Sequence, residues 1–144
     1  MAKPQLDKTL TALAGGFLVA GNLCLRGYVA SLTLKNYPKV DIFCLNPKNG
    51  KQIAIQVKTK RGGKQYYVPE NIDEFDQPYV FVYIHPDDKV DFYIVPSQEV
   101  ARLSAWEREK YLQDRPHVSR EQPRMLSIET IQKFKDRWDL LGLD

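Results

Sequence analysis

The first part of the chain carries a helical pattern of apolar positions. Between Pro4 and Arg26, apolar residues recur at steps of three and four, which is the spacing of one face of an α-helix. Gly27 follows the last of these positions, where helices commonly end. The pattern predicts a helix over 4–26 with one apolar face, formed by Leu6, Leu10, Leu13, Phe17, Ala20 and Cys24.

Three strand-like segments come next. Residues 28–34 alternate weakly between apolar and polar, residues 40–45 form a short apolar run, and residues 51–58 alternate clearly. The segment 46–50 between the last two reads Asn-Pro-Lys-Asn-Gly and carries residues typical of tight turns. We therefore expect the second and third strands to form a β-hairpin.

The second half of the chain predicts two more strands and two helices. Residues 79–84 are almost all apolar, as in a central strand covered on both faces, and a second strand is predicted over 90–95. Helices are predicted over about 97–103 and 127–138. This order, in a chain of 144 residues that suits a single domain (1–144), predicts an α/β (α+β) fold with a mixed central sheet flanked by helices.

Composition narrows the class of protein. Hydrophobic residues make up 43% and charged residues 27%, as in ordinary soluble globular proteins. No apolar run approaches the roughly 20 residues that span a bilayer, so we expect no membrane partner. Cys24 and Cys44 lack the spacing of metal ligands, which predicts buried free thiols in a reducing compartment, the cytoplasm. The net charge of +3 is compatible with a polyanionic partner.

Candidate chemistry is concentrated on the predicted hairpin. Gln56 and Lys58 share one face of their strand because side chains alternate, and Asp41 stands near the start of the partner strand. A carboxylate and an amide oxygen are ligands that suit Mg²⁺, and a neighbouring lysine can stabilise charge that develops on a phosphate. The solvated polar face of a half-exposed strand is the alternative interpretation of the same spacing, and it is the commoner case.

A basic segment with two glycines follows this strand. Lys60, Arg61 and Lys64 could contact a phosphate backbone without reading its sequence, although a solvated hairpin tip has the same composition. Tyr66 and Tyr67 come next, and their rings either stack on splayed bases or pack over the end of the sheet.

The order of these residues resembles the PD-(D/E)XK nuclease superfamily, whose core is a helix followed by a hairpin that bears an aspartate and then an acid-x-lysine motif. More narrowly, the chain is similar to small restriction-endonuclease-like proteins in which glutamine replaces the second acid. The resemblance covers most of the chain and is strongest over 15–61. The residues that carry it are Gly15–Leu23, Arg26–Tyr28, Val40–Ile42 and Ile55–Thr59, with weaker support from Tyr79–Val82, Phe92–Ser97 and Arg137–Leu141.

The resemblance implies a restriction-endonuclease-like fold and metal-dependent hydrolysis of DNA. Asp41 matches the family's metal-binding aspartate, Gln56 its substituted acid and Lys58 its catalytic lysine. The carbonyl of Val57 would join Asp41 and Gln56 as a ligand of Mg²⁺ or Mn²⁺. A homodimer is compatible with this function, because cutting both strands of a duplex commonly needs two sites related by symmetry.

One departure from the family pattern concerns the first helix. Family members of this kind carry a glutamate directly after the leading glycine, where this chain has Gly16, and a second acid where it has Asn22. A single carboxylate holds the metal weakly, so the alternative function is a non-catalytic protein- or DNA-interaction module on the same fold. Glu70 or Asp73 could complete the metal site through the fold, or could belong to a solvated loop.

Overall fold

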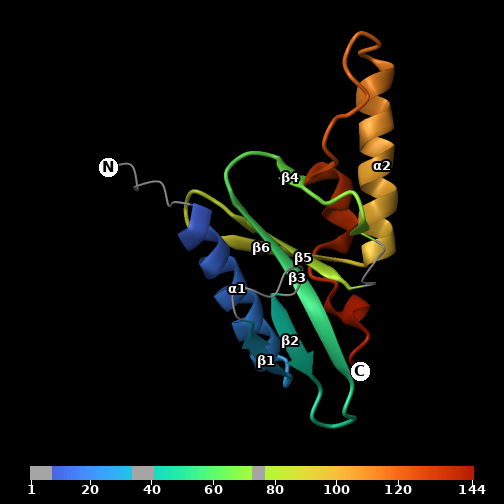
Figure 1. Cartoon of the computed structure of the whole chain (residues 1–144). Helices are drawn as coiled ribbons and strands as arrows, with labels where there is room; N and C mark the ends of the chain where they lie inside the picture. The colour runs from blue at the N-terminus through green and yellow to red at the C-terminus, as the bar shows by residue number, and fades with distance from the viewer. Residues whose placement is uncertain (1–7, 34–40, 73–76) are drawn as a thin grey trace.

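The protein is described here by a computed structural model that covers residues 8–33, 41–72 and 77–144. Its elements are shown along the chain in Figure 1. In chain order they are α1 (Lys8–Leu25), β1 (Val29–Leu32), β2 (Ile42–Leu45), β3 (Gln52–Arg61), β4 (Gln65–Tyr67), β5 (Tyr79–Ile84), β6 (Val90–Val95), α2 (Ser97–Gln113), β7 (Met125–Ser127) and the 3₁₀ helices η2 (Glu129–Phe134) and η3 (Trp138–Leu141).

The main sheet has five strands in the order β1-β2-β3-β5-β6. The pair β3–β5 is parallel and the other pairs are antiparallel, so the sheet is mixed. Strands β2 and β3 form the predicted hairpin, and the Asn46 N–H donates to the Lys51 carbonyl across its turn at 2.9 Å. Strand β5 lies between two neighbours and is almost wholly buried, as its continuous apolar run predicted.

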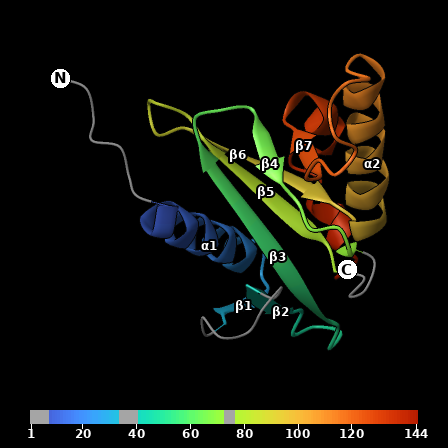
Figure 2. The ribbon, with the colours of Figure 1, turned by 45° about the horizontal axis from the view of Figure 1, so that its top comes forward.

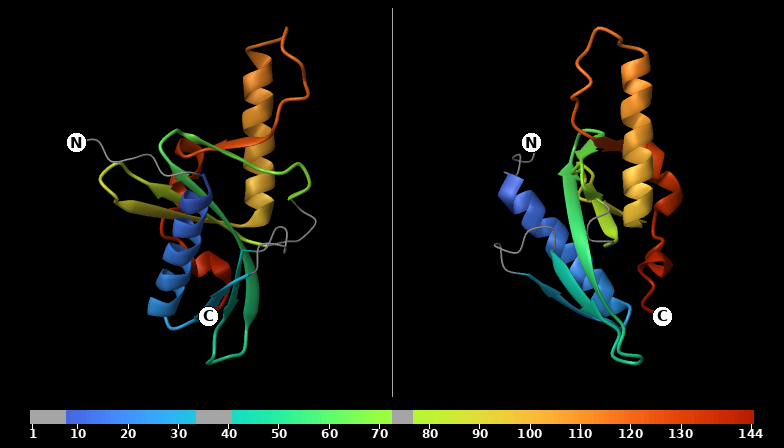
Figure 3. Two further views of the ribbon diagram at one scale, coloured as in Figure 1. Left: turned by 60° about the vertical axis from the view of Figure 1, so that its left-hand side comes forward. Right: turned by 45° about the vertical axis from the view of Figure 1, so that its right-hand side comes forward.

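Helices cover both faces of this sheet. Helix α1 lies on one face, whereas α2, β4 and β7 lie on the other (Figure 2). The right-hand view of Figure 3 shows the long strand β3 between the two helices. The alternating residues of β5 divide accordingly, because Val80 and Val82 belong to the core under α1, and Tyr79 and Phe81 belong to the core under α2.

Helix α1 contacts the sheet through a different face from the one predicted. Its buried residues are Gly15, Gly16, Val19 and Leu23, whereas Phe17 at the centre of the predicted apolar face is 63% exposed. The glycine pair explains the change, because residues without a side chain let the helix backbone approach the strands closely. Also exposed on the predicted face are Leu10, Leu13 and Cys24, so the prediction of a buried thiol holds only for Cys44.

Among the described residues, α1 is also the one helix that is long and apolar enough to cross a membrane by length and composition alone. About a fifth of its apolar window, 22%, is buried in the protein. The absence of a membrane partner therefore stays a prediction from sequence.

The other elements differ from prediction mainly at their ends. The strands over 79–84 and 90–95 are confirmed to the residue, whereas α2 continues ten residues beyond its predicted end, to Gln113. The predicted helix over 127–138 is instead the end of β7 followed by η2 and η3. The two-stranded sheet of β4 and β7 was not predicted at all.

Candidate active site

Asp41 lies at the entrance to β2, where the hairpin strands begin to separate. Its N–H donates to the Ile55 carbonyl at 3.0 Å, one residue out of register with the pair Ile42–Ile55. Its carbonyl accepts a hydrogen bond from the Thr33 N–H at 3.0 Å. An offset of one residue is how a β-bulge redirects a side chain, and it leaves the Asp41 carboxylate facing β3.

The Asp41 carboxylate is held by two donors from β3. Its Oδ2 accepts one hydrogen bond from the Gln56 side-chain amide at 2.9 Å and another from the Val57 N–H at 2.9 Å. Both bonds are part-buried, where a charge-assisted hydrogen bond is stronger than in water. The structure thus brings together two of the three side chains singled out in the sequence.

Lys58 stands two residues beyond Gln56 on the same face of β3. Its neighbour on the parallel strand β5 is Phe81, which is fully buried, so the aliphatic part of the Lys58 side chain lies beside an apolar residue. Burial lowers the pKa of Lys58, and the nearby charge of Asp41 opposes this shift without cancelling it. A lysine with a lowered pKa beside a carboxylate is a functional-site candidate rather than a solvated surface group.

The oxygen atoms around Asp41 fit a hard divalent cation. Gln56 uses its amide N–H on Asp41, and its Oε1 is buried without a hydrogen-bond partner among the described residues. In a strand, the C=O of a residue points to the same side as its N–H, so the Val57 carbonyl points toward Asp41. A carboxylate, an amide oxygen and a backbone carbonyl are ligands that Mg²⁺ accepts.

Carboxylates are scarce at this site. The described residues contain no group of three His, Cys, Asp or Glu that could hold a metal ion. A Cβ on Gly16 would lie 3.1 Å from Leu32 Cδ2, so a side chain there first meets β1. The Asn22 amide donates to the Leu18 carbonyl of its own helix at 3.0 Å. Helix α1 therefore supplies no substitute acid within the part of the chain that the structure describes.

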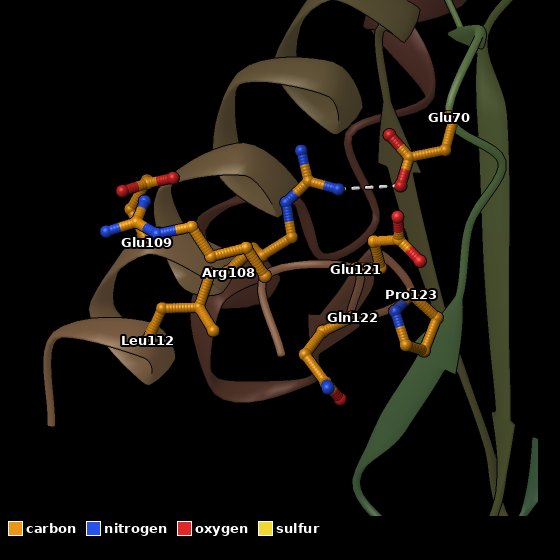
Figure 4. Close-up of a pocket in the computed structure, with 8 residues that line it drawn as sticks. Glu70, Arg108, Glu109, Leu112, Glu121, Gln122 and Pro123 are labelled. Carbon is orange, nitrogen blue, oxygen red and sulfur yellow. Dashed lines mark hydrogen bonds and ion pairs between the residues drawn. The ribbon is translucent and has the colours of Figure 1, made fainter. Parts of the chain in front are cut away.

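Glu70 is the acidic residue of the run after β4 that the structure describes. Glu70 pairs with Arg108 at 2.6 Å and with Arg124 at 3.3 Å. It lines a pocket together with residues of α2 and with Glu121, Gln122 and Pro123 (Figure 4). Its carboxylate is therefore engaged by two arginines. Asp73 lies outside the described residues.

Two of the three basic residues belong to the end of β3 rather than to a loop. Lys60 and Arg61 are its last two residues, and the turn consists of Gly62 and Gly63, whose φ angles of 81° and 72° favour glycine, before Lys64. Arg61 is paired with Asp88 at 2.9 Å. Lys64 is exposed.

The two tyrosines after this turn differ in burial. Tyr66 is buried, and its hydroxyl donates to the Val82 carbonyl at 2.8 Å, so it packs over the sheet. Tyr67 is exposed. Tyr79 is a further residue of the site, because it pairs with Gln56 in the sheet. Burial raises the pKa of the Tyr79 hydroxyl, and the Asp41 charge raises it further. Only the β3–β5 register, which no local pattern reveals, could have identified Tyr79.

Comparisons with known proteins concern the fold. No protein-family model and no curated protein sequence matches this chain. The structure is similar to that of Hjc, a Holliday junction resolvase from Archaeoglobus fulgidus, with a TM-score of 0.55 and 13% identity over 91% of this chain and 95% of that one. It is also similar to the bacterial homing endonuclease I-Ssp6803I, with a TM-score of 0.58 and 12% identity over 96% of this chain and 94% of that one.

Both of these proteins have nuclease folds of the restriction-endonuclease-like type. The chain therefore has the predicted restriction-endonuclease-like fold, a mixed central sheet flanked by helices. At this level of identity the likeness extends to the fold and not to the residues of the site.

Proposed function

We propose that this protein binds DNA and hydrolyses a phosphodiester bond at the site formed by Asp41, Gln56 and Lys58, with the aid of Mg²⁺ or Mn²⁺. One observation carries the proposal: the Asp41 carboxylate is bound by the Gln56 amide and the Val57 N–H, on the same strand as a half-buried lysine. Nuclease folds of this type, seen in a Holliday junction resolvase and a homing endonuclease, support DNA as the partner.

Each residue has a separate task in this proposal. Asp41, Gln56 Oε1 and the Val57 carbonyl would hold the cation, which when bound neutralises charge on the scissile phosphate. Lys58 donates to a phosphate oxygen and stabilises the charge that develops when the water oxygen bonds to phosphorus and the P–O bond to the leaving sugar breaks. Lys60 and Lys64 hold the DNA backbone further along β3 and its turn, and Arg61 joins them by exchanging its ion pair with Asp88 for a phosphate.

We also propose that the active form is a homodimer. Strands β1 and β6 are the edges of the main sheet, but Lys135 already bridges to Tyr93 on the outer edge of β6. A second copy that pairs along β1 would bring two sites onto the two strands of a duplex. Sedimentation of the protein with and without duplex DNA measures this directly. A monomer in both conditions would contradict it.

Nicking of supercoiled plasmid tests the proposed activity. We expect open-circular product with Mg²⁺ or Mn²⁺, and none with EDTA. The variants Asp41→Ala and Lys58→Ala should lose the activity, whereas Lys89→Ala should keep it, because Lys89 is an 81% exposed lysine in the β5–β6 turn. Nicking that survives in EDTA, or in Lys58→Ala, would remove this site from the reaction.

A second candidate function follows from the single carboxylate of the site. A protein that holds no cation could keep the fold as a non-catalytic module that binds DNA or another protein. A salt titration distinguishes a DNA-binding protein from a protein-binding module. The affinity of a DNA-binding protein for DNA falls steeply as ionic strength rises, whereas a protein-binding module shows no DNA affinity at physiological salt.

A further inference from the structure

A groove runs between α2 and the segment that contains β7 and η2, away from the candidate active site. Its volume is about 710 Å³. Side chains from α2 form one wall, and Ser127, Thr130 and Lys133 form the other. Gln65, the first residue of β4, lies at its edge.

Two aromatic side chains from α2 line this groove and are exposed. Trp106 is 52% exposed and Tyr111 is 42% exposed, although large aromatic residues usually bury most of their surface. A cationic side-chain group lies over each of the two rings. Lys110 Nζ lies 5.1 Å from the centre of the Trp106 ring, and Arg115 Cζ lies 4.2 Å from the centre of the Tyr111 ring.

The cations of the groove lie beside its aromatic rings. Four cationic residues line the groove, against three carboxylates, and one of the four, Arg102, is paired with Glu99 of its own helix at 2.6 Å. The Glu107 carboxylate accepts hydrogen bonds from the Ser127 N–H and hydroxyl and from the Thr130 hydroxyl. The cations of the groove are Arg102, Lys110, Arg115 and Lys133, and the two other acids are Asp114 and Glu129.

The groove is continuous with the basic turn after β3. The Ile128 N–H donates to the Lys64 carbonyl at 3.0 Å, and Gln65 pairs with Ser127 in the β4–β7 sheet. The segment proposed to hold the DNA backbone therefore leads directly to the edge of the groove, so one nucleic acid chain could follow both.

We propose that this groove binds single-stranded DNA, with bases stacked on Trp106 and Tyr111 and phosphates held by Lys110, Arg115 and Lys133. Aromatic rings interleaved with cations are how proteins bind single strands without sequence preference. Along α2, Trp106 and Tyr111 are separated by about 8 Å, at about 1.5 Å per residue, which suits a short stretch of nucleotides. The inference rests on the proposed function in taking DNA as the partner, and it adds an unpaired strand to what is bound.

Tryptophan fluorescence measures this binding without any cleavage. Trp138 is 5% exposed and Trp106 is 52% exposed, so quenching by an added oligonucleotide reports on Trp106. The full chain is titrated in EDTA with a single strand of sixteen thymidines and, separately, with an abasic strand of the same length and charge. The same pair is then titrated by anisotropy against Trp106→Ala, Trp106→Phe and Phe17→Ala, the last being an exposed aromatic residue of α1, which lies on the other face of the main sheet.

Stacking predicts that the thymidine strand quenches Trp106 and binds at least about 5-fold tighter than the abasic strand. Trp106→Ala should remove that preference, while Trp106→Phe and Phe17→Ala should keep it. Equal binding of the two strands would show a groove that recognises charge alone, as an acidic peptide would use, and would overturn the proposal. So would an unchanged preference in a folded Trp106→Ala protein, or no binding at low salt.

These experiments distinguish a failure of the proposed cleavage from a failure of the proposed binding to the groove. A protein that does not nick plasmid but shows the Trp106-dependent preference would lose the proposed activity and keep the groove. A protein that nicks plasmid through Lys58 but shows no preference would keep the activity and lose the groove.

Discussion

Replacing Gly15 with alanine tests how α1 is held against the strand that carries the candidate site. A Cβ at Gly15 would lie 1.7 Å from Thr59 Oγ1 and 2.7 Å from Thr59 Cβ. Rotation of the Thr59 side chain moves its oxygen but not its Cβ, so the helix itself has to shift away from β3. Gly21 is the matched control, because a Cβ there meets nothing within 4 Å.

Both substitutions gain stability from the higher helix propensity of alanine, but only the one at Gly15 creates a steric clash with Thr59. Alanine in place of glycine inside a helix stabilises it by about 1 kcal/mol, which applies to both variants. Overpacking in a core costs about 1–3 kcal/mol, and a contact at 1.7 Å belongs at the upper end of that range. We expect Gly21→Ala to be more stable than the natural protein by about 1 kcal/mol, and Gly15→Ala to be less stable by about 2 kcal/mol.

Urea unfolding measures this difference. With a slope of about 2 kcal/mol per molar urea, a gap of about 3 kcal/mol separates the two midpoints by about 1.5 M. Thr59→Ala in the Gly15→Ala background removes the closest contact and should recover part of the loss. Equal midpoints for Gly15→Ala and Gly21→Ala would refute the close approach of α1 to β3.

Two further predictions concern charged groups. In Gln56→Glu a second carboxylate replaces the amide that donates to Asp41. We therefore expect a lower melting temperature than that of the natural protein in EDTA, and a larger increase in melting temperature when Mg²⁺ is added. An equal increase in the two proteins would contradict the ligand role of residue 56. Burial raises the pKa of Asp91, but hydrogen bonds from His85 and Lys135 outweigh it and hold that pKa below its ordinary value. The stability Asp91 contributes is therefore present above its ordinary pKa and lost as pH falls through its lowered value. Asp91→Asn should unfold more easily at pH 7 and lose less stability on acidification, whereas parallel pH profiles of urea midpoints would contradict this.

The sequence predicted best where one local pattern decides the structure. The run 79–84 is apolar on both faces because β5 lies between two strands and two layers, and no other element competes for it. The turn at 46–50 is likewise set by its own residues. Helix α1 shows the limit of this reasoning, since its bulkiest apolar stripe includes Phe17, yet Gly15 and Gly16 form the close contact. Which face of a helix is buried depends on the partner strand, which periodicity does not describe.

The candidate site was likewise predictable from the sequence only in part. Alternation along β3 placed Gln56 and Lys58 on one face, and the hairpin placed Asp41 beside them. The hydrogen bond from the Val57 N–H to the Asp41 carboxylate depends on the one-residue offset at the entrance to β2, which the sequence does not reveal. Tyr79 joins the site only through the parallel pairing of strands that are far apart in the chain.

The central claim is that the oxygen atoms around Asp41 form a cation site on a restriction-endonuclease-like fold. A crystal of the protein soaked in Mn²⁺ tests it most directly, because manganese is located by its anomalous scattering. The account predicts a peak at coordination distance, about 2.1 Å, from an Asp41 carboxylate oxygen, with Gln56 Oε1 and the Val57 carbonyl around it. No peak beside Asp41 at saturating Mn²⁺, or a peak bound elsewhere on the protein alone, would contradict the claim.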